Sequence, residues 1–123
     1  MGYTTDFVGR FNFSRELTRK EEHILREFTE ERHGGNTQVF EEFPGFYCQW
    51  VPTDDGLGLE WDGGEKFYEY DNWLRFLIEK FFKPWGIVVN GEVEWHGEER
   101  SDVGCLVCKD NVVEKKRGRI VYD

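Results

Sequence analysis

The sequence has little of what would mark a secreted, membrane-bound or disulfide-stapled protein. It contains only three cysteines in 123 residues, an odd number that suggests reduced thiols in a cytoplasm rather than a disulfide framework. No apolar run approaches the roughly 20 residues that a membrane span needs. The first residues lack the basic and apolar regions of a signal peptide. We therefore expect a cytoplasmic protein with no membrane partner.

Basic residues are also scarce relative to acidic ones. The chain has 16 lysines and arginines against 25 aspartates and glutamates, a formal net charge of −9. Residues 54–102 contain thirteen acids and five bases, so this segment accounts for eight of the nine net negative charges. This balance argues against direct binding of nucleic acid, which requires a face that neutralises phosphates. One short basic run, residues 115–119, is interpreted as a solvated strand or tail.

The familiar catalytic motifs are missing as well. The chain has no nucleophile elbow, no Walker A loop and no HExxH zinc motif. Cys105 and Cys108 have the CxxC spacing, but no second ligand pair accompanies them, and a strand places them on opposite faces. We interpret them as structural. No cofactor, metal ligand or catalytic residue is predicted, which favours a non-enzymatic protein and leaves an enzyme as an open alternative.

Aromatic residues, in contrast, are abundant. They make up 17% of the chain and include eleven phenylalanines and five tryptophans. A chain of this length forms one domain with a single core, and aromatic packing should dominate that core. We expect residues 1–123 to form a single globular domain.

Periodicity predicts most of the elements. Residues 3–13 alternate as a half-buried strand, and residues 46–51 and 57–61 resemble a hairpin, with Leu57, Leu59 and Trp61 facing inward. A capping box of Thr18 and Glu21 opens a helix that runs to about residue 32 and ends at two glycines. A second helix starts at Tyr70, is capped by Asp71 and is stopped by Pro84. Its apolar stripe comprises Tyr70, Trp73, Leu74, Leu77, Ile78 and Phe81.

The pair Asn90-Gly91 is a strong signal for a two-residue hairpin turn. That turn would place Val88, Val93 and Trp95 on the core face and Glu92, Glu94 and His96 on the other face. A further hairpin is expected between residues 103–108 and 112–116, and residues 120–122 could add a last strand.

The order of the expected elements is βαββαβ followed by further strands. This order predicts an α+β two-layer sandwich, in which an antiparallel sheet carries two helices packed on one face. The first six elements have the ferredoxin-like order, and the C-terminal strands would extend that sheet.

Acidic residues gather around the first and second hairpins of this scheme and in the loop that follows the second. The candidate partner-binding residues are Glu60, Asp62, Glu92, Glu94, His96, Glu98, Glu99 and Asp102. Residues on one face of a strand lie roughly 7 Å apart, close enough for a carboxylate pair or a divalent cation. Three interpretations remain open: a solvated sheet face, an acidic surface that binds a partner, and a metal or acid/base site.

Several stretches resemble a family of small proteins that is frequent in phage and prophage genomes. They are GYTTDFVGRF (residues 2–11), PGFYCQW (44–50), EKFYEYDNWLRFLI (65–78) and NGEVEWHGEERSDVG (90–104). The resemblance spans nearly the whole chain. It implies a small accessory protein, and because the family has no established activity, it implies no catalytic residues.

The sequence therefore supports one leading hypothesis and two alternatives. The first is a phage-type accessory protein that binds and modulates a host or defence protein. Its acidic face would bind a basic surface of that partner. The second is a small carboxylate-based enzyme or ligand-binding protein, with or without a divalent metal, in which Glu92, Glu94, His96 and Asp102 must converge. The third is a structural or assembly subunit. The oligomeric state is left open.

Overall fold

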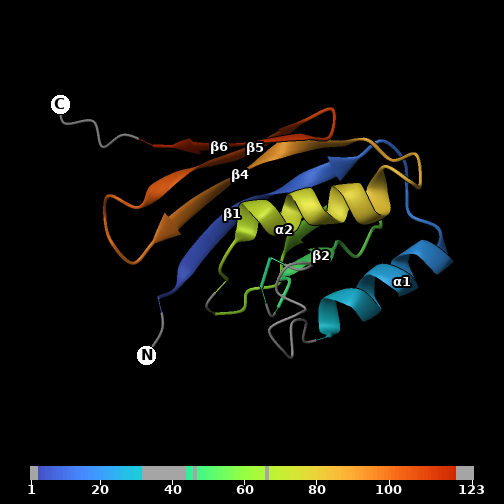
Figure 1. Ribbon diagram of the computed structural model, residues 1–123, viewed down its shortest axis with the longest axis horizontal. Helices are drawn as coiled ribbons and strands as arrows, with labels where there is room; N and C mark the ends of the chain where they lie inside the picture. The colour runs from blue at the N-terminus through green and yellow to red at the C-terminus, as the bar shows by residue number, and fades with distance from the viewer. Residues whose placement is uncertain (1–2, 32–43, 46, 66, 119–123) are drawn as a thin grey trace.

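The computed structural model describes residues 3–31, 44–45, 47–65 and 67–118. The described strands form one six-stranded antiparallel sheet, and two helices lie on one side of it (Figure 1). The elements in chain order are β1 (Thr5–Phe13), α1 (Arg19–Glu30), β2 (Trp50–Pro52), β3 (Gly58–Trp61), α2 (Tyr70–Leu77), the π-helical turn η1 (Ile78–Phe82), β4 (Val89–Gly97), β5 (Val103–Lys109) and β6 (Val112–Arg117). The predicted α+β class is confirmed.

The strands lie in the order β2-β3-β1-β4-β5-β6. The first strand is therefore in the middle of the sheet, between β3 and β4, and the two C-terminal strands continue the sheet beyond β4. The predicted strand at 120–122 and the two glycines expected to end the first helix, Gly34 and Gly35, lie outside the described residues.

The alternation predicted for the first strand is confirmed. Thr5, Phe7, Phe11 and Phe13 are buried, whereas the residues between them are exposed or half-buried. The strand is paired with β4 along its whole length, from Thr5 opposite Gly97 to Phe13 opposite Val89. This ladder forms the centre of the sheet.

The hairpin predicted at Asn90-Gly91 is wrong. Both residues lie inside β4, where Asn90 pairs with Asn12 and Gly91 pairs with Phe11. As a result Val88 does not share the core face, because it is 36% exposed, and Val89 is buried in its place. The faces assigned to the residues beyond Gly91 are nevertheless confirmed, because an alternating strand fixes them without the turn.

Gly91 has a different role from the one that the sequence suggested. Its φ is +143°, and a Cβ at this position would lie 2.9 Å from the Arg10 carbonyl oxygen and 3.0 Å from the Phe11 Cα. The glycine therefore allows the backbones of β1 and β4 to approach closely.

The tight turn of this region joins β5 to β6 instead. Asp110 and Asn111 both have positive φ, at 49° and 70°, as the central residues of a type I′ turn do. The Asn111 side chain accepts a hydrogen bond from the Val89 amide (2.7 Å) and donates one to the Ile87 carbonyl (3.1 Å). The hairpin predicted between residues 103–108 and 112–116 is confirmed, and its tip holds the start of β4 in place.

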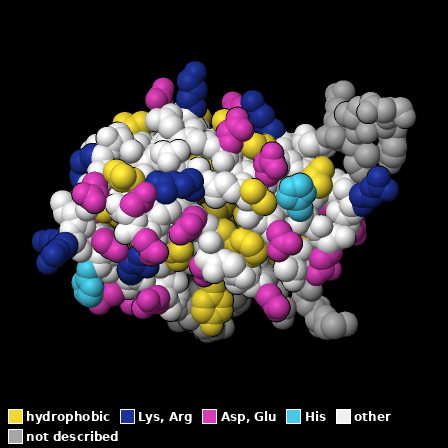
Figure 2. All heavy atoms as spheres, turned by 180° about the vertical axis from the view of Figure 1, so that it is seen from behind, with side chains coloured by type: hydrophobic (Ala, Val, Ile, Leu, Met, Phe, Trp, Pro, Cys, Tyr) yellow, Lys and Arg dark blue, Asp and Glu magenta, His cyan; other side chains and the backbone are white. Residues whose placement is uncertain are grey.

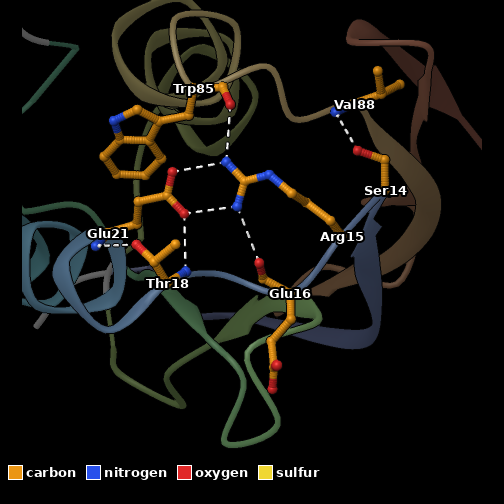
Figure 3. Close-up of polar contacts among 7 residues, drawn as sticks. All are labelled: Ser14, Arg15, Glu16, Thr18, Glu21, Trp85 and Val88. Carbon is orange, nitrogen blue, oxygen red and sulfur yellow. Dashed lines mark hydrogen bonds and ion pairs between the residues drawn. The ribbon is translucent and has the colours of Figure 1, made fainter.

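A cluster around Arg15 fixes α1 to the rest of the molecule (Figure 3). The Thr18–Glu21 capping box is present as predicted. The Arg15 guanidinium donates to both carboxylate oxygens of Glu21, each at 2.8 Å, and to the carbonyl oxygen of Trp85 at 2.9 Å. The same carboxylate accepts the Thr18 amide. These bonds lower the pKa of Glu21 from its ordinary 4.5 to about 2, chiefly through Arg15.

The second helix supplies most of the helical layer of the core. Its predicted stripe is buried from Trp73 to Phe81, and Tyr70 is half-buried at the edge of the core. The predicted cap is wrong, because Glu69 occupies the N-cap position with a left-handed backbone, while Asp71 lies in the first turn and pairs with Arg75 at 2.9 Å. Aromatic rings join this layer to β1, where Phe7 contacts Tyr70 with ring centroids 5.0 Å apart.

The hairpin β2–β3 is shorter than predicted, and one of its side chains points the other way. Leu59 is fully buried and Trp61 packs partly against the core, but Leu57 is 42% exposed. Leu57 lies before the strand, at the end of the turn in which its amide donates to Asp55 Oδ1 at 3.0 Å. Its orientation therefore follows the turn and not the alternation of the strand.

Candidate functional site

The sheet has one face that the helices leave uncovered, and we call it the outer sheet face. In Figure 1, α2 lies in front of the sheet and α1 lies beyond β2. Figure 2 shows the molecule from behind, where acidic side chains are spread among apolar and basic ones. The outer sheet face comprises Asp6, Val8, Arg10, Asn12, Glu60, Asn90, Glu92, Glu94, His96, Val103, Cys105, Val107, Lys109, Val112, Glu114 and Lys116. It is the only sheet surface among the described residues with no helix against it.

Two cross-strand rows run through its centre. In the first, Glu92 lies between Arg10 of β1 and Val107 of β5. In the second, Glu94 lies between Val8 and Cys105. The predicted residues Glu92, Glu94 and His96 thus share one exposed face on a central strand, as expected.

Most of the positive charge on this face is already paired. The Arg10 guanidinium lies 3.2 Å from Asp55, and the Lys116 ammonium lies 3.6 Å from Glu114. Within the described part of the chain, no lysine or arginine pairs with the four remaining carboxylates of the face. These are Asp6, Glu60, Glu92 and Glu94. The Glu94 carboxylate lies 3.7 Å from the His96 ring, so the β1–β3–β4 half of the face carries negative charge that no lysine or arginine among the described residues neutralises.

Cys105 lies beside this charge. Its sulfur is 3.8 Å from the Glu92 carboxylate, and burial together with the charges of Glu92 and Glu94 raises the pKa of the thiol. Cys48 and Cys108 are buried on the other side of the sheet. The prediction that Cys105 and Cys108 point to opposite faces is confirmed, and Cys105 is the most accessible thiol.

The outer sheet face is hollowed on both sides of Lys116. One depression of about 360 Å³ is lined by Glu94, His96, Val103, Gly104, Cys105, Lys116, Arg117 and Gly118. A second, of about 380 Å³, is lined by Val107, Lys109, Asp110, Val112, Glu114 and Lys116. Both are open to solvent and are lined by apolar and charged side chains together, a composition suited to a protein surface rather than to an enclosed substrate.

Asp102 does not belong to this face. Its carboxylate accepts hydrogen bonds from the Tyr3 hydroxyl (2.7 Å) and from the Trp95 indole (3.0 Å), and Trp95 points into the core. The Tyr3 bond is the main cause that lowers the pKa of Asp102. The residue is a structural acceptor on the helical side of the sheet.

The remaining predicted acids lie around the edges. Glu98 accepts the Thr4 amide at 2.7 Å, and the Glu99 amide donates to the Tyr3 hydroxyl at 3.1 Å. The carboxylate of Asp62 accepts the Gly64 amide at 2.7 Å, beyond the end of β3. These contacts hold the β4–β5 loop and the end of β3 in place. Glu98, Glu99 and Asp62 are exposed and lie just beyond the ends of the strands that form the outer sheet face.

The convergence that a metal site required is not found. Glu92, Glu94 and His96 lie together, but Asp102 is on the opposite side of the sheet. Among the described residues, no group of three or more His, Cys, Asp and Glu side chains is placed to hold a metal ion.

A second cluster, which the sequence did not reveal, surrounds Asp102. We call Tyr3, Tyr70, Trp95, Asp102 and Lys115 the Trp95 corner. The Lys115 ammonium lies 4.7 Å from the centre of the Tyr70 ring and 5.4 Å from that of Trp95. The five residues come from four separate parts of the chain, so no local motif could have identified them.

No family model, no curated protein and no solved structure matches the chain. In the part of the chain that the structure describes, no helix has the length and apolar character needed to cross a membrane.

Proposed function

We propose that the protein is an interaction module that binds a basic surface of a partner protein through its outer sheet face. One observation carries this proposal: the centre of an uncovered sheet face bears Glu92 and Glu94, and no lysine or arginine among the described residues pairs with either. A solvated face would also be polar, but a typical soluble surface has charges of both signs interspersed.

The arrangement has the mixed character of a protein-binding surface. Val8, 61% exposed, lies opposite Glu94 on the neighbouring strand, and Cys105 and Val107 continue the apolar strip across β5. Apolar contact on both sides of β4 would supply affinity, whereas the two carboxylates between these apolar residues would attract a basic partner and align it. The association should therefore weaken as salt is added.

The resemblance to phage-carried proteins suggests which partners are relevant. A small accessory protein of this type would bind a host or defence protein and modulate its activity. Proteins that handle nucleic acid have basic surfaces, and an acidic sheet face would compete for such a surface. We propose this class of partner for the outer sheet face.

We also infer that the first four strands and the two helices form a ferredoxin-like split βαβ unit. The order β2-β3-β1-β4 supports this inference, because β1 separates the two strands that flank the second helix in the chain. The hairpin β5–β6 would then be an addition that widens the outer sheet face. The fold by itself does not indicate an activity.

The carboxylate-based enzyme is less well supported, because its four required residues are not assembled. We expect Mg²⁺, Mn²⁺, Ca²⁺ and Zn²⁺ each to leave the melting temperature unchanged, since only a ligand that binds the native state raises it. A rise of several degrees with one of these ions, lost in Glu92→Gln, would favour the enzyme instead.

The interaction is tested by affinity capture from lysate of a bacterial host at low and high salt. The expected result is a defined partner that elutes as salt rises and that binds about tenfold or more weakly to the double variant Glu92→Lys, Glu94→Lys. The matched control is Glu30→Lys, Glu31→Lys, which makes the same charge change at the exposed end of α1. A partner that both double variants weaken equally would mean that net charge, and not the outer sheet face, determines binding.

A further inference from the structure

The Trp95 corner has the composition of a cation-binding site. The rings of Tyr70 and Trp95 lie 5.7 Å apart at 46° to each other, and the Lys115 ammonium is within 6 Å of both ring centres. Such distances are those of cation–π attraction, which aromatic cages use to bind alkylammonium groups.

A fixed carboxylate lies beside these rings. Asp102 is bonded through one oxygen to Tyr3 and through the other to the Trp95 indole. The charges of Arg117 and Lys115 act on it from β6 and contribute to its lowered pKa. The two aromatic rings and the carboxylate therefore keep their positions without Lys115, because none of the contacts among them involves that lysine.

The strand β5 leaves space for the Trp95 ring. Gly104 lies opposite Trp95 on β5, and a Cβ at this position would overlap the Trp95 ring. The ring can therefore lie flat against β5, where it is only 1% exposed beneath its neighbours. The corner is rigid, since Trp95 and Tyr70 are also packed against the core.

Lys115 itself is held less firmly. It lies on β6, at the edge of the sheet, its side chain is exposed, and among the described residues it forms no ion pair. An exposed cation–π contact is weak, so the lysine can leave the corner readily.

We propose that Tyr70, Trp95 and Asp102 form a binding site for an alkylammonium group, and that Lys115 occupies this site in the free protein. The ligand would be a lysine side chain of a partner or a small quaternary amine. This site lies on the helical side of the sheet, so it does not depend on binding at the outer sheet face.

The test measures the Trp95 indole N–H resonance by NMR during titration with tetramethylammonium chloride and, separately, with N-acetyl-lysine amide. Sodium chloride at equal ionic strength corrects for salt. In Lys115→Ala we expect a saturable shift at a concentration roughly threefold or more below that needed in the unsubstituted protein, because the internal competitor is gone. The probe that saturates first identifies the source of the ligand. Lys115→Gln provides a second variant that removes the ammonium group but keeps a longer, polar side chain than alanine.

The control is Lys116→Ala, which removes the same charge from the opposite face of β6 and should behave like the unsubstituted protein. Lys115→Ala combined with Asp102→Asn should lose the gain in affinity. The proposal is overturned if neither probe gives a saturable shift in either Lys115 variant, or if Lys116→Ala increases affinity equally.

Discussion

At the scale of single residues, the ion pair of Arg15 and Glu21 joins three parts of the chain. Glu21 at the start of α1 holds the Arg15 guanidinium, which follows β1 and also donates to the Trp85 carbonyl in the turn after η1. Replacing Glu21 with Gln leaves the Arg15 guanidinium without its ionised acceptor. We expect a loss of about 1–2 kcal/mol in the free energy of unfolding at pH 7, measured by urea denaturation.

The pH dependence of this loss follows from the pKa of Glu21, about 2 in the folded protein against an ordinary 4.5. A lowered carboxylate pKa contributes stability that is fully present above pH 4.5 and disappears as the pH falls toward 2. The difference between the unsubstituted protein and Glu21→Gln should therefore shrink between these values. A difference that stays constant over this range would refute the role given to the ionised carboxylate.

Asp102 offers a second test on one residue. Asp102→Asn weakens the acceptor shared by Tyr3 and Trp95, and we expect a loss of about 1–2 kcal/mol. Glu94→Gln, on the exposed outer sheet face, should change stability by less than about 0.5 kcal/mol. If the two substitutions lowered the stability equally in thermal unfolding, the hydrogen-bonded position of Asp102 and the exposed position of Glu94 would not explain their contributions.

For single residues, the sequence predicted a side-chain contact correctly where both partners are close together in the chain. The Thr18–Glu21 box could be predicted because both partners lie in one helical turn. The structural role of Asp102 could not be predicted, because its hydrogen-bond partner Tyr3 is 99 positions away in the sequence. From the sequence alone, a structural carboxylate in an acidic stretch cannot be distinguished from an exposed one. The packing of the chain makes the distinction.

At the scale of elements, the strand β4 shows why one strong local signal failed. Asn90-Gly91 has the composition of a hairpin turn, but β1 offers β4 a partner along nine residues. The tertiary ladder prevails over a local preference. Alternation is a property of the strand alone, so the inward and outward residues beyond Gly91 were predicted correctly.

This account of Gly91 predicts a large effect of Gly91→Ala. The new methyl group would meet backbone atoms of Arg10 and Phe11, and we expect a loss of about 2–4 kcal/mol. Gly63→Ala is the matched control, because its φ is also positive, at +85°, but nothing lies within 4 Å of the added Cβ. It should lose only about 1 kcal/mol. Similar losses in denaturant unfolding would mean that close approach of β1 does not explain this glycine.

At the scale of the whole molecule, the sequence located the excess of acid in residues 54–102 but not its distribution in space. Part of that charge turns out to be structural, as in Asp55, whose pKa is lowered to about 2 by hydrogen bonds from Thr53, the Leu57 amide and Arg10. Another part, Glu92 and Glu94, is exposed on an uncovered sheet. The hydrogen bonds that each carboxylate accepts in the folded chain distinguish the two groups.

The accessible thiol of Cys105 allows the central claim to be measured directly. Cys105 lies between Glu94 and Lys116 in the cross-strand rows of the outer sheet face, whereas Cys48 and Cys108 are buried. The rate of its alkylation by iodoacetamide should be followed by mass spectrometry with and without the captured partner. The account predicts that a saturating partner slows the reaction of Cys105 about tenfold or more, and that added salt restores the free rate as the complex dissociates. An unchanged rate in the intact complex would contradict binding at the outer sheet face.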